Sequence, residues 1–160
     1  TYERDDREIL FITGKKSYSE LNNNLIVPKS TKIVPFFENL PSLFKSADLV
    51  ISRAGASTIA EIMATKIPSI LIPSPYVANN HQYYNALDLV DKNMSLLIEE
   101  KDLDKKALVE AIDEMFNEKT FKKVKENLSE IKDISSSTII VDEIKKKLKD
   151  KDEKKGKKKI

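Results

Sequence analysis

The chain has 160 residues, of which 40% are hydrophobic and 34% are charged, and its formal net charge is +2, a balance typical of one soluble globular domain. It contains no cysteine and a single histidine, so disulfides, thiolate ligands and multi-histidine metal sites are excluded. No apolar run approaches the roughly 18 residues of a membrane-spanning helix, and the charged N-terminus lacks a signal-peptide core, so we expect a cytoplasmic protein.

Short runs of aliphatic and β-branched residues predict strands that are buried on both faces. These runs cover residues 9–13, 32–36, 49–52, 69–73 and 96–99. Helical patterns lie between or after them, at residues 41–46, 56–65, 82–91, 103–116, 121–131 and 138–149. The alternation predicts an α/β fold in which helices cover both faces of a parallel sheet. Ligands of such sheets bind at the carboxyl ends of the strands, so the loops at 52–57 and 74–81 are expected to face one crevice.

The most informative stretch, residues 48–61, reads Asp-Leu-Val-Ile-Ser-Arg-Ala-Gly-Ala-Ser-Thr-Ile-Ala-Glu, an apolar strand followed at once by a small-residue turn and a helix. Gly55 lets a ligand approach the backbone, and a larger residue there is expected to block this approach and to strain the turn. Ser57 and Thr58 offer hydroxyls, and the first amides of the helix lack intrahelical partners. Together with the helix dipole these features predict a phosphate or diphosphate site, with Glu61 able to reach an adjacent sugar hydroxyl. The alternative is an ordinary corner capped by Ser or Thr.

A second group of polar residues follows the next strand, in the run Pro-Ser-Pro-Tyr-Val-Ala-Asn-Asn-His-Gln-Tyr-Tyr-Asn-Ala at residues 73–86. One of the two asparagines before His81 is expected to cap the next helix. Gln82 and Asn85 are three residues apart, so they share a helix face and can offer paired amides to sugar hydroxyls. Helix capping and surface polarity are the alternative for this pair. His81 is more typical of a capping or packing residue than of a general base.

Both runs, with Pro-Ser-Ile-Leu-Ile-Pro-Ser-Pro at residues 68–75 between them, resemble in order and spacing the C-terminal half of the MurG family. MurG proteins are peptidoglycan UDP-N-acetylglucosamine transferases with the two-domain GT-B fold. The resemblance covers about Ile9 to Ile144 and implies a truncated, Rossmann-like domain that binds the nucleotide-sugar donor.

The resemblance also implies a role for individual residues in binding UDP-N-acetylglucosamine. The turn at 52–58 would meet the diphosphate, Glu61 would bind the ribose, and Gln82 with Asn85 near it would bind the sugar hydroxyls. Phe37, in the run Val-Pro-Phe-Phe-Glu-Asn-Leu at 34–40, would lie where backbone groups bind the imide edge of uracil. No cofactor and no metal is implied. The implied donor-binding residues are Phe37, Arg53, Ala54, Gly55, Ser57, Thr58, Glu61, Gln82 and Asn85.

The chain also departs from the family. The family's C-terminal domain opens with a strand and a Gly-Gly-Ser loop, and nothing before Ile9 resembles them. We expect the missing strand to leave an exposed sheet edge. The N-terminal domain, which binds the acceptor and carries the family's proposed catalytic base, has no counterpart, so the catalytic residues stay unknown. Residues 1–149 are expected to be a partial donor-binding domain, and residues 150–160 a lysine-rich disordered tail.

The family's activity implies that the whole protein transfers N-acetylglucosamine from UDP to lipid-linked N-acetylmuramyl-pentapeptide, which converts lipid I to lipid II in peptidoglycan synthesis. Its partners would be UDP-N-acetylglucosamine and, through the missing domain, the lipid-linked acceptor, with no nucleic acid. It would act as a peripheral protein on the inner face of the plasma membrane, with a part in cell shape and division, while this fragment alone would be inactive. The alternatives are half of another GT-B transferase of glycolipid or polysaccharide assembly, or a non-catalytic nucleotide-binding module.

Overall fold

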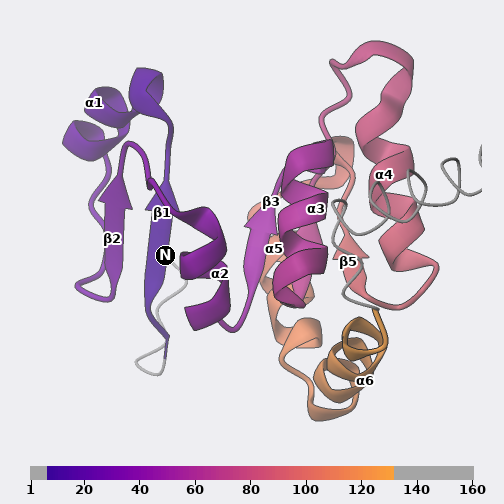
Figure 1. Cartoon of the computed structure of the whole chain (residues 1–160). Helices are drawn as coiled ribbons and strands as arrows, with labels where there is room; N and C mark the ends of the chain where they lie inside the picture. Colours follow the sequence, from indigo (N-terminus) through magenta and orange to yellow (C-terminus); the bar gives the residue numbers. More distant parts are fainter. Residues whose placement is uncertain (1–6, 132–160) are drawn as a thin grey trace, which may run out of the picture. The chain divides into compact units, whose positions relative to one another are not determined.

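The computed structural model describes residues 7–131, and Figure 1 draws the remaining residues in grey. The chain divides into two compact units, Thr1–Ser129 and Glu130–Ile160, and the fold below is that of the first. The helix predicted at 138–149 and the lysine-rich tail predicted at 150–160 lie outside the described residues.

All strands of the described chain run parallel and are joined in two sheets. One sheet has the order β1-β2 and the other the order β3-β4-β5. Each strand overlaps an apolar run that predicted it, so the expected parallel α/β fold is confirmed. The strands are β1 (Ile9–Ile12), β2 (Thr31–Val34), β3 (Val50–Ser52), β4 (Ser69–Leu71) and β5 (Ser95–Leu97).

Helices cover both faces of the β3-β4-β5 sheet. Figure 1 shows α3 in front of this sheet and α5 behind it, while α4 contacts β5. No helix among residues 7–131 is long and apolar enough to cross a membrane. The helices are α1 (Lys15–Asn24), α2 (Leu40–Ser46), α3 (Ala56–Thr65), α4 (His81–Val90), α5 (Lys105–Met115) and α6 (Glu118–Ser129), with short 3₁₀ turns η1 (Ala78–Asn80) and η2 (Glu100–Asp102).

Helix α1 was not predicted from the sequence. It reads Lys-Lys-Ser-Tyr-Ser-Glu-Leu-Asn-Asn-Asn and has no buried residue, so it lacks the apolar period by which a helix is recognised. Gly14 begins this helix with φ 78°, a backbone region that glycine enters without steric cost. Gly14 therefore allows the chain to turn from β1 directly into α1.

The hydrophobic core lies between α3, α4 and the β3-β4-β5 sheet. Ile62 of α3, Leu71 of β4 and Ala86 of α4 are wholly buried there. Full burial of one isoleucine or leucine side chain is worth about 1.5–3 kcal/mol. Ala54 belongs to the same buried cluster, so the turn that follows β3 is anchored in the core.

Candidate functional site

The first turn of α3 has no side-chain cap. Gly55 is its N-cap residue, and no side chain accepts a hydrogen bond from the first amides of the helix. Helices α2 and α5 are capped: Asn39 Oδ1 accepts from the Ser42 amide at 3.0 Å, and Asp104 Oδ1 accepts from the Ala107 amide at 2.7 Å. The corner capped by Ser or Thr is therefore not observed, and the open amides of α3 fit an anion site.

The backbone of Gly55 is unstrained, and there is free space where a side chain at this position would lie. Its φ of −67° and ψ of 147° are accessible to any residue. A Cβ atom added here would find Thr58 Oγ1 at 3.9 Å as its nearest contact beyond the adjoining residues. The expectation that a larger residue strains this turn is wrong, because the backbone needs no glycine. The space beside the first amides of α3 is what a larger side chain would fill.

Three polar side chains near this corner are available to a ligand. Ser57 is exposed, and Thr58 and Glu61 are half-buried. Within residues 7–131, none of the three side chains forms a hydrogen bond or an ion pair. Glu61 lies more than one turn into α3, and its backbone carbonyl accepts from Thr65 Oγ1 at 2.7 Å. The carboxylate of Glu61 is therefore free to accept from a ligand hydroxyl.

The Arg53 side chain links the turn after β3 to the segment that follows β4 and to η2. Its Nη1 atom donates to the carbonyl oxygens of Ile72 at 3.3 Å and Pro73 at 3.5 Å. The same nitrogen contacts the carboxylate of Glu100 in η2. A guanidinium group has five N–H donors, so the donors on Nε and Nη2 are left for the diphosphate contact that the resemblance implies.

The two amide side chains of α4 hold the same loops. Gln82 Oε1 accepts from the Ser74 amide at 2.9 Å, and Asn85 Nδ2 donates to the Ala54 carbonyl oxygen at 3.1 Å. The Asn85 contact joins the turn after β3 to α4, and the Gln82 contact joins the loop after β4 to the same helix. Each side chain keeps one group for a ligand, the Nε2 donors of Gln82 and the Oδ1 acceptor of Asn85.

The start of α4 differs from the prediction. Asn79 and Asn80 both have positive φ, 53° and 50°, and neither side chain caps α4. The predicted asparagine cap is wrong: both residues adopt the left-handed conformation that asparagine tolerates better than most residues. His81 Nδ1 forms a hydrogen bond with the Ala78 carbonyl oxygen at 2.9 Å, in keeping with a local structural role.

Phe37 follows β2 of the β1-β2 sheet, whereas the other implied residues follow β3 and β4 of the other sheet. It is half-buried in the loop between β2 and α2. Within the described chain no hydrogen bond or ring contact links Phe37 to the turn at 52–58. The adjacent Phe36 is exposed, and the Lys15 ammonium lies 5.7 Å from the centre of its ring.

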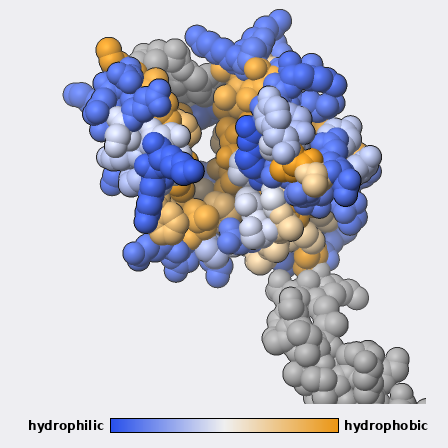
Figure 2. Space-filling model, turned by 90° about the horizontal axis from the view of Figure 1, so that it is seen from above, coloured by the Kyte–Doolittle hydropathy of each residue, from blue (hydrophilic) through white to orange (hydrophobic). Residues whose placement is uncertain are grey.

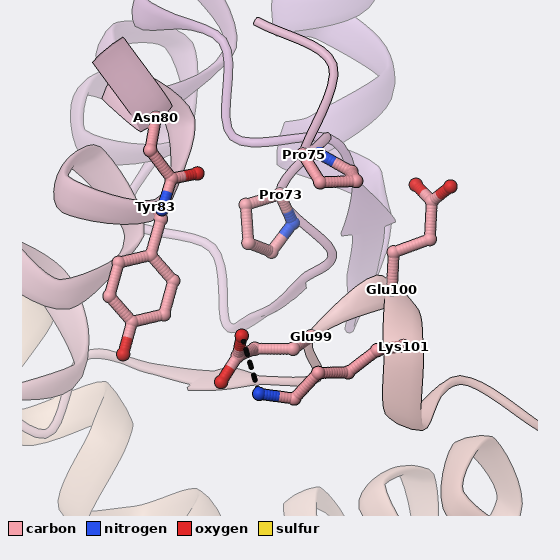
Figure 3. A pocket seen from close by; sticks show the side chains of 7 residues that line it. All are labelled: Pro73, Pro75, Asn80, Tyr83, Glu99, Glu100 and Lys101. Carbon is pink, nitrogen blue, oxygen red and sulfur yellow. Dashed lines mark ion pairs between the residues drawn. The ribbon is translucent and has the colours of Figure 1, made fainter.

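A small pocket that the sequence did not predict lies beside the Arg53 contact. Its volume is about 120 Å³, room for a few water molecules only, and Figure 3 shows the side chains around it. The Lys101 ammonium lies 3.2 Å from the Glu99 carboxylate, and this contact raises the pKa of Lys101. The pocket was missed because its lining comes from separate loops: Pro73, Pro75, Asn80, Tyr83, Glu99, Glu100 and Lys101.

Known proteins are similar to this chain in sequence. Residues 2–138 match the Glycosyltransferase family 28 C-terminal domain. The UDP-N-acetylglucosamine--N-acetylmuramyl-(pentapeptide) pyrophosphoryl-undecaprenol N-acetylglucosamine transferase of Bacillus cytotoxicus is 45% identical over 122 residues, which are 74% of this chain and 34% of that protein. The protein of the same name from Caldanaerobacter subterraneus subsp. tengcongensis is 45% identical over 116 residues, 69% of this chain and 32% of that protein. This chain therefore spans about a third of the length of the curated relatives it matches.

Solved structures share the fold. MurG of Acinetobacter baumannii has a TM-score of 0.73 at 23% identity, over 87% of this chain and 41% of that protein. The glycotransferase of kitacinnamycin has a TM-score of 0.64 at 16% identity, over 78% of this chain and 30% of that protein. At these identities the likeness concerns the arrangement of strands and helices alone.

Proposed function

We propose a function from one premise: this chain belongs to the family of Glycosyltransferase family 28 C-terminal domains. This membership and the named relatives confirm the resemblance to the MurG family. They also confirm the expected fold class, parallel sheets with helices on both faces, as in a GT-B C-terminal domain.

The chain is the donor-binding part of a hexosyltransferase that moves N-acetylglucosamine from UDP to lipid-linked N-acetylmuramyl-pentapeptide in peptidoglycan synthesis. The names of the 45% identical relatives support this donor and this acceptor. Parts of the longer protein outside this chain would bind the acceptor and supply the catalytic base. The whole enzyme would work on the inner face of the plasma membrane, where a lipid-linked acceptor is within reach.

The observation that carries the proposal is the uncapped start of α3, joined through Asn85 to the helix that carries Gln82. The diphosphate of UDP would lie against the first amides of α3, where the helix dipole favours negative charge. UDP is the leaving group of the transfer, so negative charge grows on the diphosphate as the glycosidic bond breaks. Amides that are already oriented toward this charge stabilise the transition state more than the ground state.

The other implied residues would determine which donor binds. Glu61, as a charged acceptor, would bind the ribose hydroxyls. The free Nε2 donors of Gln82 and the free Oδ1 acceptor of Asn85 would bind hydroxyls of the N-acetylglucosamine. The loop that contains Phe37 would bind uracil through backbone groups while apolar side chains cover the ring.

Calorimetric titration of the chain with UDP, UDP-N-acetylglucosamine and UDP-glucose tests the proposal. UDP and UDP-N-acetylglucosamine are expected to bind, and UDP-glucose more weakly than UDP-N-acetylglucosamine. Preference for UDP-glucose would favour another GT-B transferase of glycolipid or polysaccharide assembly. Equal affinity for all three ligands would favour a non-catalytic nucleotide-binding module, and no binding of UDP would contradict the proposal.

A further inference from the structure

Arg53 reaches the segments that follow two neighbouring strands. It lies in the turn after β3, and its Nη1 atom donates to the carbonyl oxygens of Ile72 and Pro73, which follow β4. The same atom contacts the carboxylate of Glu100 in η2, which follows β5. One guanidinium nitrogen therefore joins the segments that follow all three strands of the β3-β4-β5 sheet.

Glu100 supplies the strongest of these three contacts. The two carbonyl oxygens are neutral acceptors at 3.3 and 3.5 Å from Nη1. These distances are long for N–H···O hydrogen bonds, which usually measure about 2.7–3.2 Å. The contact with the carboxylate is a salt bridge, and a hydrogen bond between charged groups is about twice as strong as a neutral one. The Glu100 carboxylate therefore decides where Nη1 is held.

Water has access to this pair of side chains. Figure 1 shows β3 pointing upward, so Figure 2, which is seen from above, shows the face at the carboxyl end of that strand, and hydrophilic residues cover much of it. The Arg53 side chain is 52% exposed and that of Glu100 is 26% exposed. A salt bridge with this exposure contributes little to the stability of a fold. Removal of the Glu100 carboxylate should therefore leave the chain folded.

The contacts of Nη1 also restrict the rest of the Arg53 guanidinium group. This group is planar, so holding Nη1 narrows the range of directions in which the Nε and Nη2 donors can point. Among the described residues these two atoms form no hydrogen bond, so they are left for an anion. Donors that are oriented before a ligand arrives lose less conformational entropy on binding than mobile ones. Glu100 can thus strengthen the proposed diphosphate contact without touching the ligand.

The peptide group between Pro73 and Ser74 links Arg53 to Gln82. Its carbonyl oxygen, which belongs to Pro73, accepts from Arg53 Nη1. Its amide, which belongs to Ser74, donates to Gln82 Oε1 at 2.9 Å. The carbonyl and the amide of one peptide group lie in one rigid plane, so a shift at one end moves the other. The position of Arg53 therefore also affects Gln82, whose Nε2 donors are expected to bind the sugar.

We infer that Glu100 is a positioning residue of the donor site, a role that rests on the proposed function. It holds Arg53 so that the free guanidinium donors meet the diphosphate, and it keeps the peptide group between Pro73 and Ser74 in place for Gln82. A different explanation predicts an effect of opposite sign. A carboxylate that only adds negative charge would repel the diphosphate, so its removal would strengthen UDP binding.

Two alanine variants of the whole chain separate these explanations. Glu100→Ala removes the contact with Arg53, whereas Glu99→Ala removes the same charge one residue earlier, from a carboxylate that contacts Lys101 instead. Circular dichroism establishes that both variants fold. The guanidinium N–H signals of Arg53 are then measured by NMR without ligand, and they are simple to assign because the sequence has arginine only at positions 4, 7 and 53. We expect Glu100→Ala to merge these signals, because rotation about the Cζ–Nε bond becomes faster, and Glu99→Ala to leave them separate.

Nucleotide binding is compared by calorimetry for UDP and UDP-N-acetylglucosamine and by NMR titration for uridine. Glu100→Ala should weaken UDP binding at least about fivefold, a part of what a hydrogen bond to a charged group contributes. It should weaken UDP-N-acetylglucosamine binding more, because Gln82 is affected too, and leave uridine binding unchanged, because uridine has no diphosphate. Glu99→Ala should weaken none of the three. Glu100→Gln keeps an oxygen that accepts from Arg53, so its UDP affinity should stay within about twofold of that of the unchanged chain.

Four results would overturn the inference. Separate Arg53 signals in Glu100→Ala would mean that Glu100 does not hold the guanidinium group. Stronger UDP binding by Glu100→Ala would show charge repulsion, and equal losses for UDP and uridine would show a general structural effect. Equal losses for UDP and UDP-N-acetylglucosamine would exclude the link to Gln82.

Failure of the proposed function would look different. No binding of UDP by the unchanged chain would contradict that function and, with it, the donor role of Glu100. The Arg53 signals need no ligand, so they would still show whether Glu100 holds the guanidinium group.

Discussion

Asn85 of α4 holds the backbone of the turn that begins α3: its Nδ2 atom donates to the carbonyl oxygen of buried Ala54 at 3.1 Å. The contact joins residues that are 31 positions apart, Ala54 in the turn after β3 and Asn85 in α4, the helix that follows β4. A residue implied in sugar binding therefore also positions the expected phosphate site. Changes at Asn85 and at Gln82 should thus have different effects on the nucleotide.

Asn85→Ala should weaken binding of both UDP and UDP-N-acetylglucosamine, because the turn that would hold the diphosphate loses its support. The buried Ala54 carbonyl loses its side-chain donor, so unfolding in urea should show a loss of about 1–3 kcal/mol. Calorimetry of the two ligands and urea titration measure these effects. A loss confined to UDP-N-acetylglucosamine would show that Asn85 acts only on the sugar.

Gln82→Glu separates sugar binding from loop positioning. A carboxylate oxygen can still accept from the Ser74 amide, but the Nε2 donors are gone. Affinity for UDP-N-acetylglucosamine should fall by about 1–3 kcal/mol relative to UDP, with little change in stability. Gln82→Ala is the matched variant that also loses the Ser74 contact, so it should lower stability as well. Equal losses for UDP and UDP-N-acetylglucosamine in Gln82→Glu would contradict a sugar-binding role.

Gly14→Ala should lower the free energy of unfolding, whereas Gly55→Ala should not. Gly55 has an ordinary φ of −67°, so alanine should leave the free energy of unfolding unchanged or raise it by about 0.4–1 kcal/mol. Gly14 has φ 78° and ψ 151°, a region that is nearly restricted to glycine, so alanine there should cost about 1–3 kcal/mol. Thermal unfolding compares the two.

A larger side chain at position 55 tests whether the diphosphate binds at this corner. Gly55→Val should leave the protein folded but fill the space beside the first amides of α3, weakening UDP binding by a few kcal/mol. Unchanged UDP affinity in the folded Gly55→Val variant would remove this corner as the diphosphate site.

Central strands were predictable, because strands buried on both faces are read directly as apolar runs. Ile70 and Leu71, both wholly buried, belong to such a run. Helix α1 was not predictable by the same reasoning, since none of its residues is buried. Local sequence identified the corner at Gly55, because the turn and helix start are contiguous in the chain.

The partners of the site residues could not be read from the sequence. Arg53 contacts the Pro73 carbonyl and Glu100, which lie 20 and 47 positions away. Such contacts depend on how loops from separate strands meet at one edge of the sheet. The division into two sheets was equally unpredictable, because an apolar run does not specify which neighbour a strand pairs with.

Two explanations of Glu61, binding of the ribose and interaction with the helix dipole, predict different effects of its substitution on UDP affinity. A carboxylate near the start of a helix is stabilised by about 0.3–1 kcal/mol whether or not a ligand exists. Glu61→Gln keeps the shape and removes the charge, so it should cost little stability. As a ribose ligand Glu61 accepts as a charged group, and hydrogen bonds to charged groups are worth about 1.5–3 kcal/mol. The variant should therefore lower affinity for UDP more than affinity for its 2′,3′-dideoxyribose analogue.

A double cycle of protein variant against ligand hydroxyls, measured by calorimetry, isolates the coupling between Glu61 and the ribose. Glu110→Gln is the control, since Glu110 lies on α5 and, among residues 7–131, pairs with the exposed Lys106 at 3.7 Å; it should change neither affinity. Additive losses of binding free energy in the Glu61 cycle would mean that Glu61 does not contact the ribose. They would also weaken the whole donor-site proposal, because Glu61 is the residue expected to link the phosphate corner to the nucleoside.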